Sequence, residues 1–215
     1  ASASAASASL PHLLRQVWAA QKRTALGFYH SPAFHAPVVT IWVASFGGAL
    51  HAPVTTFYYL ELGATELDVG WLAFVSTLGG LLLAPAYGWL LDRRSAFAAL
   101  CASCLMCSTG CLVRGLAQDV RGLFVGAGVL GLGAGSLWTT VLGFLSKRSP
   151  ADRRPAVISG YLFQVTLLRI LGKSLYPLWN RFVDRGLGVA DELPRYRVHM
   201  GVCTLFCFFG FFKLL

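Results

Sequence analysis

The sequence has 215 residues, of which 56% are hydrophobic and 13% are charged, and its mean hydropathy of +0.62 is positive. This balance excludes an ordinary soluble domain, which needs polar residues to cover its surface. The net charge of +9 does not indicate a nucleic-acid partner, because the Lys and Arg residues lie between hydrophobic runs rather than in one patch. We therefore expect an integral, multi-pass membrane protein whose outer surface contacts the lipid bilayer.

Residues 1–37 differ in composition from the rest of the chain. They open with ASASAASAS, a run without acidic residues that resembles the neighbourhood of an organelle transit-peptide cleavage site, with a disordered leader as the alternative. Residues 10–29 then mix Leu, Val, Trp and Phe with Arg15, Lys22 and Arg23, a pattern typical of an amphipathic helix lying on a membrane surface. The segment is therefore predicted to be a leader followed by an interfacial helix.

Residues 38–215 contain six apolar segments that are long enough to span a bilayer. A spanning helix needs roughly 20 mostly apolar residues, because about 1.5 Å of rise per residue must cover about 30 Å of hydrocarbon. The six predicted spans are residues 38–60, 69–91, 96–116, 122–145, 156–182 and 198–215. The sequence thus predicts an all-α membrane protein with one bundle of six transmembrane helices.

The links between these spans alternate in charge. The links after the second and fourth spans, DRRS and SKRSPADRRP, are basic, whereas those after the first and third, ELGATELD and AQDVR, contain acidic residues. Basic loops stay on the cytoplasmic-type side of a membrane, which places both termini there. In an organelle this side is the stroma of a plastid or the matrix of a mitochondrion, and together with the leader the pattern favours a chloroplast envelope or thylakoid membrane with both termini in the stroma.

Two of the links resemble loops that occur in a known protein family. In GWLLDRRS, the residues Gly88, Asp92, Arg93 and Arg94 match the Gly-x-x-x-Asp-Arg core of the loop between helices two and three of major facilitator superfamily (MFS) transporters. The basic Pro/Arg loop SPADRRPAVISG after the fourth span is similar to the loop that follows helix four in that family. The resemblance covers residues 38–215 and implies the amino-terminal six-helix half of a twelve-helix transporter, with these four residues in a gating loop.

Transporters of this family close their substrate path between two six-helix halves. The resemblance therefore implies a second half, supplied by the chain's own continuation, by a second copy or by another subunit. The alternative is a half-length relative that no longer transports and serves as a structural or assembly subunit of a larger plastid membrane complex. No enzyme is expected, because the spans contain neither paired carboxylates nor a nucleophile beside a base.

Three ionisable residues lie near the middle of predicted spans, where a charge costs about 2.5–3.5 kcal/mol. Arg169 and Lys173 are four residues apart, so they share a helix face, and no acidic residue of the same helix is near them. His51 can titrate near neutral pH or bind a substrate group. If the three face a cavity, they predict a site for a small organic or phosphorylated anion. In the alternative, Lys173 extends towards the membrane interface and Arg169 binds backbone carbonyls or a partner subunit.

The fourth span is rich in glycine. Gly126, Gly128 and Gly131 satisfy the dinucleotide fingerprint G-x-G-x-x-G, but they lie inside one apolar segment, without the preceding strand or the later acidic residue that a nucleotide site needs. Together with Gly133 and Gly135, they predict close packing of this helix against its neighbours.

The run CASCLMCSTGC in the third span has the cysteine spacing of small ferredoxins. On a helix, the four cysteines fall within one arc of about 120° but extend about 15 Å along the axis, which is too far for one compact cluster. We therefore expect neither a metal nor a cofactor, and we interpret Cys101, Cys104, Cys107 and Cys111 as a packing face. His199 lies at the edge of the last predicted span, where we expect a surface role.

Overall fold

A computed structural model describes residue 19 and residues 32–93, 95–189 and 191–214, and no strand occurs among them. Its helices are α2 (Pro32–Glu61), α3 (Glu66–Arg93), α4 (Ala96–Leu116), α5 (Val120–Arg148), α6 (Arg154–Arg181) and α7 (Glu192–Leu214), with a short π-helical segment, η1 (Phe182–Gly186), after α6. Apart from Ala19, the predicted interfacial helix lies outside the described residues.

Five of these helices, α2 to α6, are long and apolar enough to cross a membrane. The prediction of an all-α membrane protein is thus confirmed. The predicted sixth span corresponds to α7, a helix of 23 residues that packs against α2 and α4 in the same bundle. A membrane-spanning role for α7 stays a prediction.

Most of the helices extend a few residues beyond the predicted apolar spans, and polar residues cap the starts of α4 and α5. The Asp119 carboxylate accepts a hydrogen bond from the backbone N–H of Gly122 (2.8 Å) at the start of α5. Ser95 does the same for Phe97 (3.2 Å) at the start of α4. Hydropathy therefore locates the hydrocarbon-embedded part of each helix, and the capping residues determine where the helix begins.

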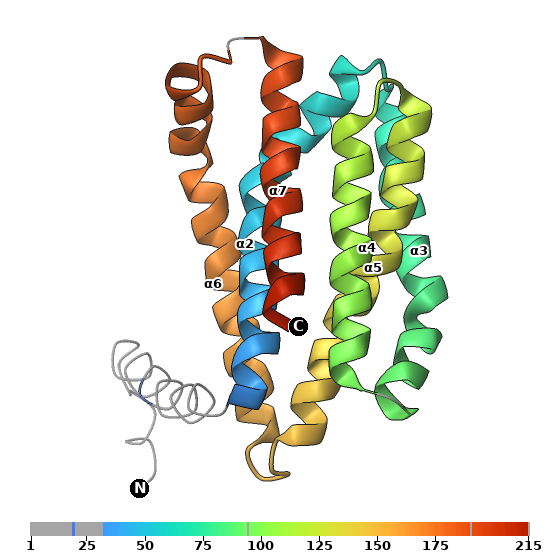
Figure 1. The fold of residues 1–215 in the computed structure, drawn as a ribbon, viewed down its shortest axis with the longest axis vertical. Helices are drawn as coiled ribbons and strands as arrows, with labels where there is room; N and C mark the ends of the chain where they lie inside the picture. Colours follow the sequence, from blue (N-terminus) through green and yellow to red (C-terminus); the bar gives the residue numbers. More distant parts are fainter. Residues whose placement is uncertain (1–18, 20–31, 94, 190, 215) are drawn as a thin grey trace, which may run out of the picture.

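The helices pack in the spatial order α6, α2, α7, α4, α5, α3 (Figure 1). In this view, α6, α2 and α7 lie side by side on the left, and α4, α5 and α3 on the right. Across the bundle, α5 contacts α2 and α6 at only a few residues, whereas α2 and α6 pack along each other. The arrangement leaves room for a cavity among these three helices.

Two separate apolar clusters hold the two ends of the bundle together. One lies towards the basic loops and includes the fully buried Ile41, Leu100 and Val141. The other lies at the opposite end and includes Tyr58 and Met200, where the Tyr58 hydroxyl donates to the Arg114 carbonyl oxygen at 2.7 Å. Between them, in the middle of the bundle, the packing consists mainly of buried cysteines.

The expectation of a surface role for His199 is wrong, because its side chain is only 1% exposed. Trp179 Nε1 of α6 donates a hydrogen bond to His199 Nδ1 (2.8 Å), so the imidazole proton lies on Nε2, which is 3.3 Å from Asn180 Oδ1. The prediction failed because α7 begins at Glu192, well before the predicted apolar span. His199 therefore lies inside a helix and ties α7 to the end of α6.

Candidate functional site

A cavity of about 280 Å³ lies in the middle of the bundle. It is lined by seven residues of α2 between positions 41 and 52, four residues of α5 between positions 130 and 138, two residues of α6 and four cysteines of α4 and α7. The two residues of α6 are Arg169 and Lys173, and α2 contributes His51. The structure thus brings the three ionisable residues predicted for substrate binding to one cavity.

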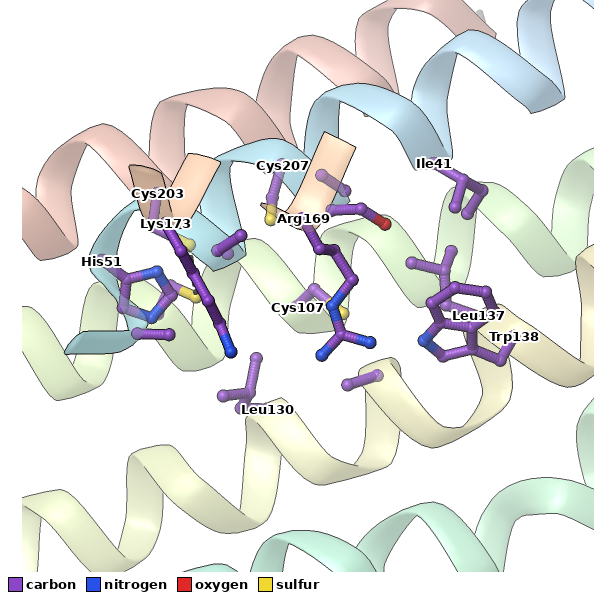
Figure 2. Close-up of a pocket in the computed structure, with 17 residues that line it drawn as sticks. Ile41, His51, Cys107, Leu130, Leu137, Trp138, Arg169, Lys173, Cys203 and Cys207 are labelled. Carbon is purple, nitrogen blue, oxygen red and sulfur yellow. Dashed lines mark hydrogen bonds between the residues drawn. The ribbon is translucent and has the colours of Figure 1, made fainter. Parts of the chain in front are cut away.

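Arg169 and Lys173 come from consecutive turns of α6, and both side chains extend across the cavity towards Leu130 of α5 (Figure 2). Both are exposed within this chain. Neither forms an ion pair with another residue in the described ranges, and none of the described cavity residues is acidic. Two positive charges therefore face the cavity without a counter-charge from its walls, a setting that favours an anion.

His51 lies on the wall formed by α2 and is half-buried. Its Nδ1 atom is 3.1 Å from the backbone carbonyl oxygen of Gly47. Because a carbonyl oxygen only accepts hydrogen bonds, Nδ1 is the donor. This leaves Nε2 as the ring atom that can bind a ligand in the cavity.

Gly172 fixes the position of the two cations, although the sequence alone does not single it out. A Cβ atom at this residue would lie 2.9 Å from both the Ala49 Cβ atom and the Phe46 carbonyl oxygen of α2. The absence of a side chain therefore lets α6 pack directly on α2. A single glycine within an apolar run carries no signal of which helix it approaches, so this contact could not be predicted.

Two glycines of α5 lie against α3. A Cβ atom at Gly131 would overlap the carbonyl group of Ser76, and one at Gly135 would overlap Gly80. The two backbones are therefore in direct contact, as small residues permit between helices in lipid. This contact places α5 at a fixed distance from α3.

Two more glycines of α5 lie against α4. A Cβ atom at Gly126 would be 2.8 Å from the backbone N of Arg114, and one at Gly133 would be 2.6 Å from the backbone N of Cys107. Gly128 differs, because its Cβ atom would have only Val75 Cγ1 nearby, at 3.7 Å. With α3 and α4 packed on two of its faces, α5 presents its remaining face to the cavity.

The cysteine stripe of α4 is a packing face, as predicted for Cys104, Cys107 and Cys111, which are buried; Cys101 is partly exposed. The sequence does not show that Cys203 and Cys207 of α7 meet this stripe. The four residues Cys107, Cys111, Cys203 and Cys207 form one buried cluster beside the cavity.

The predicted gating loop lies far from the cavity, at the end of the bundle that carries the basic links. Asp92, in the last turn of α3, forms an ion pair with Lys147 at the end of α5. The Arg93 guanidinium carbon lies 5.7 Å from the ring centroid of Trp89. A Cβ atom added at Gly88 would have no atom within 4 Å among those compared. Arg94 lies outside the described residues.

We expect the replacement Asp92→Asn to change the free energy of unfolding by less than about 1 kcal/mol. The carboxylate is 66% exposed and the Lys147 side chain 53%, so water and salt screen the pair. Thermal unfolding of the full chain in detergent, at low and high salt, measures the effect. Lys147→Gln is the matched control, and the double variant should lose no more than either single variant. A loss above about 2 kcal/mol in Asp92→Asn would contradict a surface ion pair.

The sequence and the fold were compared with known protein families and solved structures. Residues 38–215 match the Major Facilitator Superfamily. Among solved structures, the chain is similar to the POT family transporter PepTSo in its in meso crystal structure, with a TM-score of 0.55 and 18% sequence identity. The similarity covers 81% of this chain and 36% of that transporter, so the chain spans about a third of the transporter's length. No curated protein matches the sequence.

Proposed function

Because the chain belongs to the major facilitator superfamily, we propose that it forms half of a membrane transporter for a small organic or phosphorylated anion. The main support is the cavity lined by Arg169 and Lys173, in which no described residue carries a negative charge. An anion that enters the cavity offsets both charges and replaces the water that each cation would otherwise require. The charge of the cavity therefore selects the class of substrate.

The three ionisable residues would have different roles in such a site. Arg169 offers a planar fork that fits the two oxygens of a carboxylate or phosphate, whereas Lys173 acts as a point charge one turn away. His51 reaches the cavity from α2, where Nε2 can exchange a proton with the bound anion. Binding would therefore involve both α2 and α6.

We infer that a second six-helix bundle covers the cavity, supplied by the chain's own continuation, a second copy or another subunit. Both α3 and α6, the two ends of the packing order, expose large apolar side chains: Leu81 is 70% exposed and Leu82 66% on α3, and Ile170 is 56% exposed on α6. Transport would then follow from rocking of the two bundles around the cavity. The basic links of this half would lie on the stromal side of a plastid membrane.

Uptake by proteoliposomes tests this function. The native protein, isolated together with whatever supplies its second half, is reconstituted into liposomes and given radiolabelled phosphoenolpyruvate, a probe that carries both a phosphate and a carboxylate, with glucose as a neutral control probe. We expect saturable uptake of the anion and none of glucose. Uptake of phosphoenolpyruvate, inorganic phosphate and malate that stays at the level of empty liposomes would contradict the proposal. A stable large assembly of the native protein that lacks such uptake would favour a structural subunit instead.

A further inference from the structure

The cavity wall contains a second reactive group, which is chemically unlike the two cations. Cys111 of α4 and Cys203 and Cys207 of α7 place their three Sγ atoms within 4.8 Å of one another. The Sγ atoms of Cys111 and Cys203 are 3.6 Å apart. The side chains are only 2%, 3% and 5% exposed, so these thiols meet in the interior of the bundle.

The spacing of the sulfur atoms fits a metal site with three ligands. In a planar trigonal site with metal–sulfur bonds of about 2.3 Å, neighbouring sulfur atoms are about 4.0 Å apart. The observed separation of 3.6 Å and the upper limit of 4.8 Å lie on either side of this value. A disulfide would instead require a sulfur–sulfur distance of about 2.05 Å. The positions of the three sulfur atoms are therefore compatible with one ion bound between α4 and α7.

We propose that Cys111, Cys203 and Cys207 form a binding site for Cu(I). Thiolates are soft ligands, and soft ligands select Cu(I), zinc and iron–sulfur clusters. Zinc prefers four protein ligands in a structural site, but neither His51 nor Cys107 belongs to the group of ligand atoms within 4.8 Å. Three thiolates without a fourth ligand suit Cu(I).

The surroundings provide access for the ion and compensate its charge. All three cysteines line the cavity, which gives the ion a route from water to the sulfur atoms. Binding releases three thiol protons to water and transfers no electron, and the resulting complex of one Cu(I) with three thiolates carries a double negative charge. Arg169 and Lys173 line the same cavity and offset this charge. The three ligands of the Cu(I) site are independent of the proposed anion transport, but the same two cations serve both sites, so the double negative charge of bound Cu(I) is expected to oppose anion binding in the cavity.

Competition for Cu(I) tests the site in the purified full chain. Under argon, Cu(I) is supplied as its coloured complex with bicinchoninate, and its transfer to the protein is followed by the loss of colour. We expect one tightly held Cu(I) per chain, with three sulfur neighbours at about 2.3 Å in X-ray absorption. Failure to take Cu(I) from bicinchoninate, or preferential binding of Zn(II), would overturn the proposal.

Serine variants assign the ligands. Cys111→Ser, Cys203→Ser and Cys207→Ser should each weaken Cu(I) binding by more than about 100-fold, because the loss of a ligand costs at least as much as the loss of its outer hydrogen-bond partner. Cys104→Ser is the matched control: this residue lies on α4 and is 1% exposed, but it belongs to the apolar cluster at the basic end. Equal losses in Cys104→Ser would overturn the assignment.

A measurement on the unaltered chain covers the case in which a variant fails to fold. The protein is alkylated with N-ethylmaleimide with and without Cu(I), and the labelled peptides are mapped by mass spectrometry. Cu(I) should protect Cys111, Cys203 and Cys207 and leave Cys101 open to labelling. Equal protection of Cys101, no protection of the three thiols, or a disulfide between Cys111 and Cys203 in place of copper would each contradict the site.

Discussion

Uptake of phosphoenolpyruvate is expected to fall to the level of empty liposomes when Arg169 and Lys173 are both replaced by Gln. Each cation can form charge-assisted hydrogen bonds with the anion, and a hydrogen bond to a charged group contributes about 1.5–3 kcal/mol. Each single variant should therefore lower kcat/KM by about tenfold or more. Arg169→Lys should recover part of the loss, because it retains the charge but not the planar fork.

The controls separate a loss of binding from a loss of folding. Arg181→Gln removes a cation from the end of the same helix, outside the cavity, and should leave uptake unchanged. The melting temperature of the double variant should stay the same or rise, because two unpaired charges have been removed from the middle of the bundle. Unchanged uptake in the stable double variant would remove Arg169 and Lys173 from the substrate site.

We expect the second large effect, a loss of folding stability, from the substitution Gly131→Ala, which adds a single methyl group. In Gly131→Ala, the new Cβ atom would overlap the Ser76 carbonyl group of α3. Neither backbone can move without separating the two helices along their whole contact, and overpacking of this kind typically costs about 1–3 kcal/mol and sometimes more. We expect a loss of about 3 kcal/mol or more, measured as a lower melting temperature and as aggregation in size-exclusion chromatography.

Gly128→Ala is the matched control for this prediction. It makes the same change one turn earlier on the same helix, where the Cβ atom would meet only Val75 Cγ1 at 3.7 Å, an ordinary van der Waals distance. Since alanine is favoured over glycine in a helix by up to about 1 kcal/mol, this variant should be neutral or slightly stabilising. Equal melting temperatures for the two variants would show that the approach of α3 to α5 is not limited by Gly131.

The ends of a helix could be predicted from the sequence where an apolar run stops and charged residues begin at the same position. The sequence predicts the third span at residues 96–116, and α4 has these bounds because a basic link precedes it and AQDVR follows it. The start of α7 could not be found in this way. Arg197 looks like part of a polar link, but its guanidinium donates to the Ala117 carbonyl oxygen (3.3 Å) from within the helix. Only the packed neighbours of such a residue reveal that it is helical.

For the candidate site, the sequence predicts which residues share a face of one helix, but not which helices meet. The shared face of Arg169 and Lys173 follows from their spacing, and so does the cysteine stripe of α4. Which helix each face meets depends on contacts between distant parts of the chain. The pairing of Cys111 with Cys203 joins residues that are 92 positions apart, and neither hydropathy nor charge encodes that α4 packs on α7.

The packing order of the bundle has a consequence for its biosynthesis. Among the described helices, α2 is made before the others, but it packs mainly on α6 and α7, and the Thr40 hydroxyl donates to the Gly210 carbonyl oxygen of α7 (3.1 Å). Roughly ninety residues separate the end of α2 from the start of α6, which a ribosome needs about 5–20 s to translate. Meanwhile α3, α4 and α5 can already pack on one another. Of the six described helices from α2 to α7, the earliest made is therefore the one that waits longest for its native neighbours.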